Sequence, residues 1–578
     1  MSSTLLTGRG AAPGAALAPA FVLRADPAAD IALPDRREGS SEAENARLGT
    51  ALSTAEVQLR ALAEQLERTA GPDEAEIFEA HAEFADDPEL ASMARQHIEE
   101  GASAERAVTT AFGTFRDLLS ASSSEYLAAR AEDLDDVRDR VVAILQGRSV
   151  VVAAPEVRSV IVARELTPSQ TASLPRALIA ALVTETGSPT SHAAILARSL
   201  GIPAVVGCEG LLEVVDDGTT LAVDGRDGSI IVDPDDAQRD AVEQQLDLER
   251  ARERELEALR DREGRTADGH RVELAANIGS PEDLVVAVEA GAEGSGLVRT
   301  EFLFQESRTA PTVDEQVRFY TEVLRAFPGH RVVFRTMDVG ADKPLHFVER
   351  DPEENPALGL RGIRLHLARP ELFRDQLRAL LRAHVEVAGE DAGELAIMFP
   401  LVAVVDEFLQ ARRLLRDVAD EEGIELDTIE VGVMIEVPSA ALGAHRIAQH
   451  ADFLSIGTND LLQYLFAVDR LQSSVAEIAE VCEPDALHLI GQVIEAGHAA
   501  GSWVGVCGEA ASDPLVAAAL VGLGVDELSM TRVAIPEVKD TLNHLDLETC
   551  QTAVRAALRD GDDATSVRRL LAEALERV

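Results

Sequence analysis

Apolar residues follow a helical repeat in the segment that starts near residue 41. They recur at alternating steps of four and three residues, which places them on one face of a helix. The residues of this stripe are Leu48, Leu52, Ala55, Leu59, Leu62 and Leu66. Proline is rare from there to residue 147, so the pattern predicts that residues 41–147 form an all-helical bundle.

Shorter apolar runs rich in β-branched residues follow the bundle. They begin at residues 150–154 and 160–163, and the later ones are separated by Asp-Gly turn signals. This pattern of short apolar runs and turns predicts a compact α/β domain. The apolar segment before the bundle is predicted to supply strands to the same domain. Residues 1–25 and 148–236 would then form one domain, with residues 26–147 inserted in it.

A third pattern begins near residue 264. Eight short apolar segments alternate with helical stretches, at residues 272–278, 296–300, 332–337, 395–401, 431–436, 453–457, 503–508 and 526–530. Eight such units predict that residues 264–578 form a TIM barrel, with an insertion in the long third interval. Residues 237–263 are dense in Glu, Arg and Leu and contain no Gly or Pro, so they predict a linker helix. The predicted fold class is multidomain α/β.

The composition narrows the class of protein. The 578 residues correspond to about three or four domains at roughly 100–200 residues each. No run of about 18 apolar residues predicts a membrane span, and the first residues lack the pattern of a secretory signal. The four cysteines match neither a zinc spacing nor a disulfide framework. A cytoplasmic protein without membrane insertion is expected.

The chain is strongly acidic. Its formal net charge of −49 argues against nucleic acid and anionic membranes as partners. Only Lys343 and Lys539 are lysines, so arginine supplies the other basic residues. Two explanations remain open. The acidic surface is an adaptation to high salt, in which ions screen self-repulsion, or GC-rich coding has replaced lysine by arginine.

Polar residues stand at the carboxyl end of one predicted barrel strand after another. They are Arg299, Glu301, Arg335, Asp338, Glu436, Asn459, Asp460, Cys507 and Glu509, with Arg361 and Arg364 in the insertion and Arg470 beyond Asp460. In such barrels the strand ends form the active site. Arginines bind phosphate and carboxylate through paired hydrogen bonds, and carboxylates with open positions suit Mg²⁺. The pattern predicts a pocket for a small phosphorylated carboxylic acid.

Simpler explanations exist for each of these residues taken alone. A single arginine is more often part of a surface salt bridge, but several arginines at independent strand ends favour a pocket. A single cysteine is more often a small core residue. At a barrel strand end, Cys507 is a candidate proton donor or nucleophile.

A second candidate site lies in the α/β domain. His192 follows a Gly-Ser-Pro-Thr-Ser turn and opens a helix-like segment. A helix N-terminus offers N–H groups and positive potential to a phosphate, and Thr190 or Ser191 is a candidate cap. An imidazole nitrogen is a nucleophile at neutral pH, and phosphoimidazole is a reactive donor. A lone histidine is more often structural, but this setting favours a phosphoryl acceptor.

Taken in series, these segments resemble enzyme I of the bacterial phosphoenolpyruvate-dependent sugar phosphotransferase system. The segment GSPTSHAAILARSLGIPAVVG resembles the phosphohistidine signature of that family. The segments that resemble its phosphoenolpyruvate-binding barrel are GLVRTEFLF, FRTMDVGADKPL, ENPALGLRGIR, IMFPL, GVMIEVPSA, DFLSIGTNDLLQYLFAVDR and VGVCGEAASDP. The motif order is kept over nearly the whole chain, so the set is specific.

The resemblance implies a swivelling phosphohistidine domain, a helical insertion that docks the phosphocarrier protein HPr, and a homodimeric barrel. It implies that phosphoenolpyruvate phosphorylates His192, which then phosphorylates HPr, and that pyruvate is released. By the same match, Glu436 and Asp460 bind Mg²⁺ and Cys507 protonates the enolate. The residues implied to contact the substrate are Arg299, Arg335, Arg361, Asn459 and Arg470.

The sequence departs from the family pattern beside His192. The family commonly has Gly-Gly-Arg before Thr-Ser-His, whereas this chain has Gly187, Ser188 and Pro189. An arginine is therefore missing, and Pro189 has no N–H. Both changes affect the phosphate contacts of this loop and the rate of transfer.

Three other interpretations remain open. A pyruvate–phosphate dikinase or phosphoenolpyruvate synthase shares the histidine and barrel parts, but no glycine-rich nucleotide loop precedes His192. A regulatory phosphorelay paralogue usually carries a further sensory domain, for which the residues before the bundle leave no room. A catalytically inactive interaction protein disagrees with the intact set of candidate residues.

Overall fold

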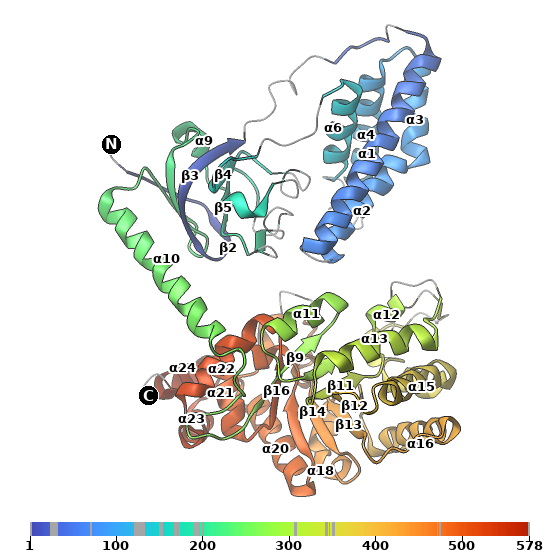
Figure 1. Ribbon diagram of the computed structural model, residues 1–578, viewed down its shortest axis with the longest axis vertical. Coiled ribbons are helices and arrows are strands. Elements are labelled where there is room, and N and C mark those ends of the chain that lie inside the picture. Colours follow the sequence, from blue (N-terminus) through green and yellow to red (C-terminus); the bar gives the residue numbers. More distant parts are fainter. Residues whose placement is uncertain are drawn as a thin grey trace. The chain divides into compact units, whose positions relative to one another are not determined.

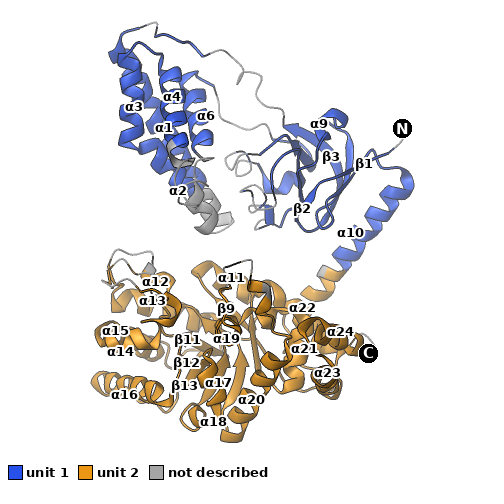
Figure 2. Cartoon of the chain, turned by 180° about the vertical axis from the view of Figure 1, so that it is seen from behind, with its two compact units in different colours: residues 1–251 blue, residues 252–578 orange. Residues whose placement is uncertain are grey.

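The protein is described by a computed structural model in which two compact units comprise residues 1–251 and 252–578 (Figures 1 and 2). The described residues are 3–23, 33–37, 39–69, 72–120, 133–148, 154–166, 170, 174–188, 191, 194, 197–198, 201–305, 309–340, 345, 347–348, 353–470, 472 and 475–575. Among the described helices, none combines the length and the apolar character needed to cross a lipid bilayer.

Unit 1 contains the predicted helical bundle. Its helices are α1 (Ser41–Thr69), α2 (Pro72–Asp86), α3 (Pro88–Glu99), α4 (Ala104–Ser120) and α6 (Asp133–Leu145). The apolar stripe of α1 is buried at Leu48, Leu52, Ala55 and Leu59, each of which stabilises the bundle by removing apolar surface from water. The side chain of Leu66 lies outside the described residues. The prediction of an all-helical bundle is confirmed.

The remainder of unit 1 is built on an eight-stranded sheet in the order β1-β8-β7-β3-β4-β5-β6-β2. Its strands are β1 (Thr4–Thr7), β2 (Arg9–Ala12), β3 (Ala15–Leu23), β4 (Ser159–Ala163), β5 (Ile179–Thr184), β6 (Ala204–Val206), β7 (Thr220–Asp224) and β8 (Ser229–Val232). Strand β3 precedes the bundle and pairs in parallel with β4, which follows it. The bundle is therefore an insertion in an α/β domain, as the sequence predicts.

A long helix, α10 (Asp236–Glu257), follows the sheet and continues past residue 251, where the two compact units divide. Many of its side chains are exposed, including Leu248. Arg226 pairs with Glu249, which ties the helix to the turn between β7 and β8. The helix occupies most of the segment for which the sequence predicts a linker.

Unit 2 is a closed barrel of eight parallel strands, so the predicted TIM barrel is confirmed. The strands are β9 (Glu273–Ile278), β10 (Ser295–Val298), β11 (Arg331–Arg335), β12 (Glu394–Phe399), β13 (Glu430–Ile435), β14 (Phe453–Ile456), β15 (Trp503–Val506) and β16 (Glu527–Met530). Each overlaps one of the predicted segments, and β10, β11, β12 and β13 begin one residue earlier than predicted. The fourth segment is predicted to reach Leu401, but β12 ends at Phe399 because Pro400 has no N–H for the ladder.

Helices surround the barrel (Figures 1 and 2). They are α11 (Pro281–Glu289), α12 (Phe302–Gln305), α13 (Val313–Ala326), α14 (Ile363–Ala368), α15 (Pro370–Glu386), α16 (Val405–Glu422), α17 (Pro438–Leu442), α18 (Ala444–Ile447), α19 (Thr458–Phe466), α20 (Pro484–Ala500), α21 (Pro514–Leu523), α22 (Ile535–His544), α23 (Leu547–Asp560) and α24 (Ala564–Leu575). The predicted insertion between the third and fourth strands contains α14 and α15.

Alternation along each strand separates the interior of the barrel from the layer beneath the helices. On β11, Val332 and Phe334 belong to the core shared with the helices, whereas Val333 packs in the interior beside Met398 and Met434. Because side chains alternate with a period of two, Arg331 and Arg335 share the inward face with Val333. One arginine therefore stands at each end of the interior.

Candidate active site

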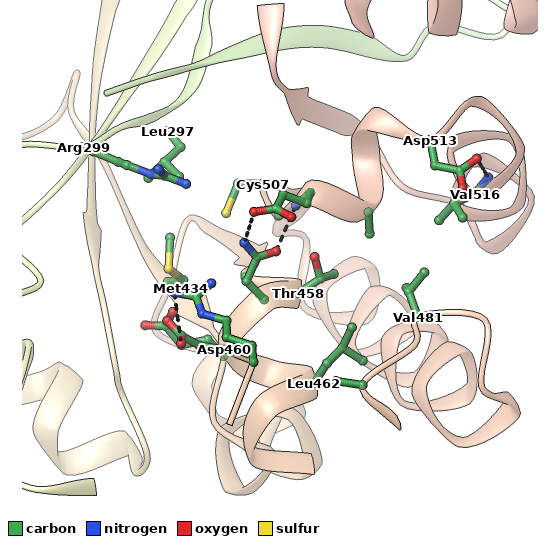
Figure 3. A pocket seen from close by; sticks show the side chains of 18 of the residues that line it. Leu297, Arg299, Met434, Thr458, Asp460, Leu462, Val481, Cys507, Asp513 and Val516 are labelled. Atoms are coloured by element: carbon green, nitrogen blue, oxygen red, sulfur yellow. Dashed lines mark hydrogen bonds and ion pairs between the residues drawn. The ribbon is translucent and has the colours of Figure 1, made fainter. Parts of the chain in front are cut away.

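A cavity of about 940 Å³ opens at the C-terminal ends of the barrel strands. Nine of the residues predicted for the site line it: Arg299, Glu301, Arg335, Glu436, Asn459, Asp460, Arg470, Cys507 and Glu509. Figure 3 shows that Arg299, Cys507 and Asp460 come from separate segments and surround a common space. The fold thus brings together residues that are up to about 200 positions apart in the sequence.

Arg335 is held by two carboxylates at the edge of this cavity. Its guanidinium lies 3.1 Å from Glu301 and 3.2 Å from Asp338. Burial disfavours its charge, but the neighbouring carboxylates outweigh burial and raise the pKa of Arg335 above its ordinary value. Glu301 also accepts a hydrogen bond from the Asp338 N–H at 2.6 Å. The position of this cation is therefore fixed by the protein itself.

Arg361 is almost completely buried and is not among the residues that line the cavity. Its guanidinium donates to both oxygens of Asp338, at 3.1 and 2.9 Å, and to Asp460 at 2.9 Å. It also donates to the hydroxyl of Tyr464 at 3.3 Å. Arg361 therefore holds Asp460 in place, and the substrate contact that the resemblance implies for it stays a prediction.

Glu436 is buried beside two other carboxylates. Burial, together with the charges of Asp338 and Asp460, raises the pKa of Glu436 to about 8. Its Oε1 accepts a hydrogen bond from the N–H of Leu401 at 2.6 Å. Leu401 has a φ of 56°, a left-handed conformation that is uncommon for a residue with a side chain. The turn after β12 thus adopts a strained conformation where it meets the candidate metal ligand.

The carboxylates of Glu436 and Asp460 have the chemistry expected of a Mg²⁺ site. Asp460 accepts from Arg361 through Oδ2, but its buried Oδ1 has no hydrogen-bond partner among the described residues. The guanidinium of Arg470 lies 4.0 Å from Oδ1. Mg²⁺ binds such oxygens and takes its other ligands from water and phosphate. Within the described part of the chain, no group of three or more His, Cys, Asp or Glu side chains is arranged for a metal ion.

Cys507 follows β15 and packs with Leu297 and Met434 at the apolar floor of the cavity. Its Sγ lies 3.7 Å from the carbonyl oxygen of Ile456. Burial raises the pKa of this thiol to about 12 because it penalises the thiolate. A thiol that keeps its proton at neutral pH suits proton donation better than nucleophilic attack.

Two arginines in the cavity lining are exposed. Arg470 retains 37% of its side-chain exposure, and Arg299 forms no ion pair with any described residue. Neither is enclosed by carboxylates as Arg335 is, so both can receive an anion that enters from solvent.

Sequence reasoning missed a further part of the cavity wall. This part includes Thr458, Glu480, Asp513 and Arg568. Arg568 comes from α24, near the end of the chain, and lies 2.7 Å from Asp513 and 3.0 Å from Glu480. No strand-end pattern marks Glu480, Asp513 or Arg568. The available signal was Asp513 before Pro514, which indicates the start of α21 and not a pocket.

The candidate phosphoryl acceptor, His192, lies outside the described residues, as do Pro189 and Thr190. In the loop before His192, the structure describes Gly187, which has a φ of 106°, a backbone conformation that disfavours residues with side chains. Ser191 Oγ accepts a hydrogen bond from the N–H of Ala194 at 3.4 Å. A hydroxyl that accepts from an N–H three residues later is the pattern of a helix cap, which the sequence predicts for this position.

The fold and the cavity define a class of protein, a (β/α)₈-barrel enzyme with a cationic pocket at its C-terminal rim. Three domain families match the chain, all described as PEP-utilising enzyme: the PEP-binding domain at residues 253–547, the N-terminal domain at 7–130 and the mobile domain at 155–228.

Curated relatives match along most of their length. A protein of Staphylococcus carnosus is 42% identical over 93% of this chain and 94% of its own. One of Haloferax volcanii is 43% identical over 87% of each chain, and one of Geobacillus stearothermophilus is 42% identical over 93% of each. All three are named phosphoenolpyruvate-protein phosphotransferase. The chain belongs to this family, and the resemblance to enzyme I is confirmed.

Proposed function

We propose that this chain is a phosphoenolpyruvate–protein phosphotransferase. It transfers the phosphoryl group of phosphoenolpyruvate to His192 and then to a histidine of the phosphocarrier protein HPr, and it releases pyruvate as the first step of sugar uptake by the phosphotransferase system. Family membership over most of the chain supports this reaction. The observation that carries the proposal is the cavity that combines arginines, the carboxylates of Glu436 and Asp460, and a thiol whose pKa is raised.

The arginines supply the binding energy for an anionic substrate. Arg299, Arg335 and Arg470 hold the phosphate, because all three line the cavity and guanidinium groups bind phosphate oxygens in pairs. Asn459 contacts the substrate through its amide. Arg361 lies behind the cavity wall, where it holds the carboxylate of Asp460 in place.

Glu436 and Asp460 are the proposed ligands of Mg²⁺. Their oxygens lie in the cavity wall, and the unpartnered Oδ1 of Asp460 is an available ligand atom. When bound, Mg²⁺ supplies positive charge to the phosphoryl oxygens. The ion also relieves the repulsion between these carboxylates.

In the proposed reaction, His192 accepts the phosphoryl group and Cys507 supplies the proton that completes pyruvate. A neutral ring nitrogen of His192 attacks phosphorus, the N–P bond forms, and the bond between phosphorus and the enol oxygen breaks. The electron pair released to the enolate takes a proton at the methylene carbon from Cys507 Sγ, which gives pyruvate. Cys507 then regains a proton from solvent. The apolar floor of Leu297 and Met434 limits access of water to this proton transfer.

We assign residues 1–25 and 148–236 to the phosphohistidine domain, residues 237–263 to the linker helix and residues 264–578 to the barrel. His192 must meet both phosphoenolpyruvate and the carrier, so its domain is proposed to swing about the linker helix.

Residues 26–147 are the proposed docking domain for HPr. On α2 the acidic residues Glu79, Glu83 and Asp86 are exposed, and their spacing places them along one side of the helix. Such a face complements a basic surface on a carrier.

The barrel is the proposed homodimerisation domain, by analogy with the family. A cytoplasmic location is proposed because all four cysteines are buried and none forms a disulfide.

The deciding experiment is incubation of the full chain with ³²P-labelled phosphoenolpyruvate and Mg²⁺. The wild type is expected to take up acid-labile, base-stable label, and His192→Ala is expected to take up none. His450→Ala, in which an exposed histidine outside the cavity is removed, serves as the matched control. Label that persists in His192→Ala, or a wild type that requires ATP, would contradict the proposal.

A further inference from the structure

Glu509 binds the side chain of Asn459 inside the cavity through two hydrogen bonds. Asn459 Nδ2 donates to Glu509 Oε1 at 3.0 Å. The backbone N–H of Glu509 donates to Asn459 Oδ1, also at 3.0 Å. Both residues line the cavity, so this pair belongs to the wall that faces the substrate.

The two bonds fix which end of the amide carries oxygen. A backbone N–H only donates, and an ionised carboxylate only accepts. If the amide were flipped, its NH₂ group would meet the N–H and its oxygen would meet the carboxylate, and both bonds would be lost. The orientation of Asn459 is therefore determined by a single neighbouring residue.

The amide keeps hydrogen-bonding capacity after these two contacts. Nδ2 has a second N–H, and Oδ1 has a second lone pair. In the fixed orientation the remaining N–H is a defined donor at the cavity wall. A phosphate or carboxylate oxygen of the substrate is the matching acceptor.

The backbone brings the two residues together. Asn459 lies in the first turn of α19, just beyond β14, and Glu509 lies two residues after Cys507, beyond β15. Gly508 permits the contact, since a Cβ at this position would lie 1.8 Å from Thr458 Oγ1 and 2.8 Å from Thr458 N. The Asn459–Glu509 pair thus connects the segment that carries Cys507 to the segment that carries Asp460.

We propose that Glu509 is a positioning residue for the phosphoenolpyruvate site, acting through the amide of Asn459. The carboxylate itself carries the wrong charge to bind an anionic substrate. Its contribution is therefore the hydrogen bond that Oε1 accepts, and a neutral acceptor of the same shape is expected to replace it. The inference rests on the proposed function, because turnover of phosphoenolpyruvate is its readout.

The test compares Glu509→Ala, Glu509→Gln, Asn459→Ala and the double variant in the full chain. Steady-state pyruvate release gives kcat and KM for phosphoenolpyruvate. Glu509→Ala is expected to lower kcat/KM about tenfold, the effect of one hydrogen bond that orients a substrate contact. Glu509→Gln keeps the acceptor oxygen and is expected to stay within about twofold of wild type. The double variant is expected to be no worse than Asn459→Ala, because Glu509 acts through Asn459.

Glu537→Ala, in which an exposed carboxylate of α22 outside the cavity is removed, is the matched control. A Glu509→Gln variant as impaired as Glu509→Ala, or additive losses in the double variant, would overturn the inference. So would an unchanged kcat/KM in Glu509→Ala together with an active wild type. A wild type that does not turn over phosphoenolpyruvate would instead overturn the proposed function, and this inference with it.

Discussion

Burial raises the pKa of two neighbouring acids of the cavity, the thiol of Cys507 and the carboxyl group of Glu436, with different chemical results. It raises the pKa of Cys507 to about 12 and that of Glu436 to about 8. The thiol therefore keeps its proton throughout the physiological range, whereas the carboxyl group ionises at its upper edge. A protonated sulfur at an apolar floor is suited to deliver a proton to carbon.

Replacement of Cys507 tests this role directly. Cys507→Ala is expected to lower the rate of pyruvate formation about 100-fold or more, the usual effect of losing a general acid. In the wild type, ionisation of Cys507 is expected to cause no decline in the rate between pH 6 and pH 9, because the pKa of this thiol lies near 12. Pyruvate release measured across this pH range checks both statements.

The control is Cys550→Ala, in which another buried cysteine outside the cavity is removed. It is expected to retain the wild-type rate per folded molecule. A Cys507→Ala variant that forms pyruvate at the wild-type rate would exclude Cys507 as the proton donor.

At the level of the barrel strands, the N-terminal ends hold a second charged cluster. Arg331 lies 2.9 Å from Glu430, 3.0 Å from Glu273 and 3.7 Å from Glu527, and its guanidinium stacks 3.9 Å from the ring of Trp503. Three carboxylates thus share one cation. Burial, with the charge of Glu273, raises the pKa of the buried Glu527 to about 8.

This cluster predicts a pH-dependent stability of the barrel. The folded-state pKa of Glu527, about 8, lies above the unfolded value near 4.5, so the folded chain binds more protons between these limits. The contribution of Glu527 is fully present below pH 4.5 and is lost as pH rises to 8, by up to about 1.4 kcal/mol per pH unit. Glu527→Gln is expected to flatten this slope and to raise the Tm of the barrel at pH 8.

Thermal unfolding of both proteins at pH 5, 6, 7 and 8 measures the difference. Glu394→Gln, which changes an exposed carboxylate at the start of β12, is the matched control and is expected to keep the wild-type slope. Parallel curves for wild type and Glu527→Gln would show that Glu527 is already ionised in the folded chain.

Helix α22 is attached to the barrel through one of the two lysines of the chain. Lys539 is fully buried, and its Nζ donates to the carbonyl oxygens of Arg260 at 3.0 Å and Gly291 at 3.1 Å. Glu293 lies 3.8 Å away. Lys539→Met would leave both carbonyls without this donor and is expected to destabilise the barrel by about 3–5 kcal/mol.

Urea unfolding followed by the fluorescence of Trp503, the single tryptophan, reports this change. Glu548→Ala, an exposed change on α23, is expected to shift the midpoint little. A midpoint for Lys539→Met equal to that of the wild type would show that the buried ammonium is not needed.

The sequence predicts the elements of this chain better than their contacts. All eight barrel strands were predictable, because buried parallel strands are short apolar runs with a length and spacing of their own. The alternation within each strand also turns Arg335 and Met434 inward. The contacts of Arg361 were not predictable in this way, because Arg361 pairs with Asp338 and Asp460, which lie 23 and 99 residues away in the sequence. Arg568 reaches the cavity from the last helix, and no local pattern encodes such a placement.

For the whole molecule, the main electrostatic quantity is the excess of acidic residues. There are 102 Asp and Glu residues against 53 Lys and Arg, which gives the net charge of −49. Many basic residues are already engaged, as Arg378 and Arg382 are with Glu422. The remaining acids repel one another across the surface and destabilise the compact state at low ionic strength. Replacement of lysine by arginine through GC-rich coding leaves charge unchanged, so it does not account for this excess.

The excess predicts a salt-dependent stability. The Debye length falls from about 10 Å at 0.1 M to about 3 Å at 1 M, so added KCl screens most repulsion between surface carboxylates. The Tm is expected to rise with KCl, steeply at first and then less so as screening saturates. Sucrose at matched osmolality separates screening from a general stabilisation of compact states, because it is excluded from the protein surface but carries no charge. If screening dominates, KCl raises the Tm well above the sucrose curve below 1 M. Coincident curves, or a Tm that falls as KCl is added, would show that the acidic surface is not adapted to high salt.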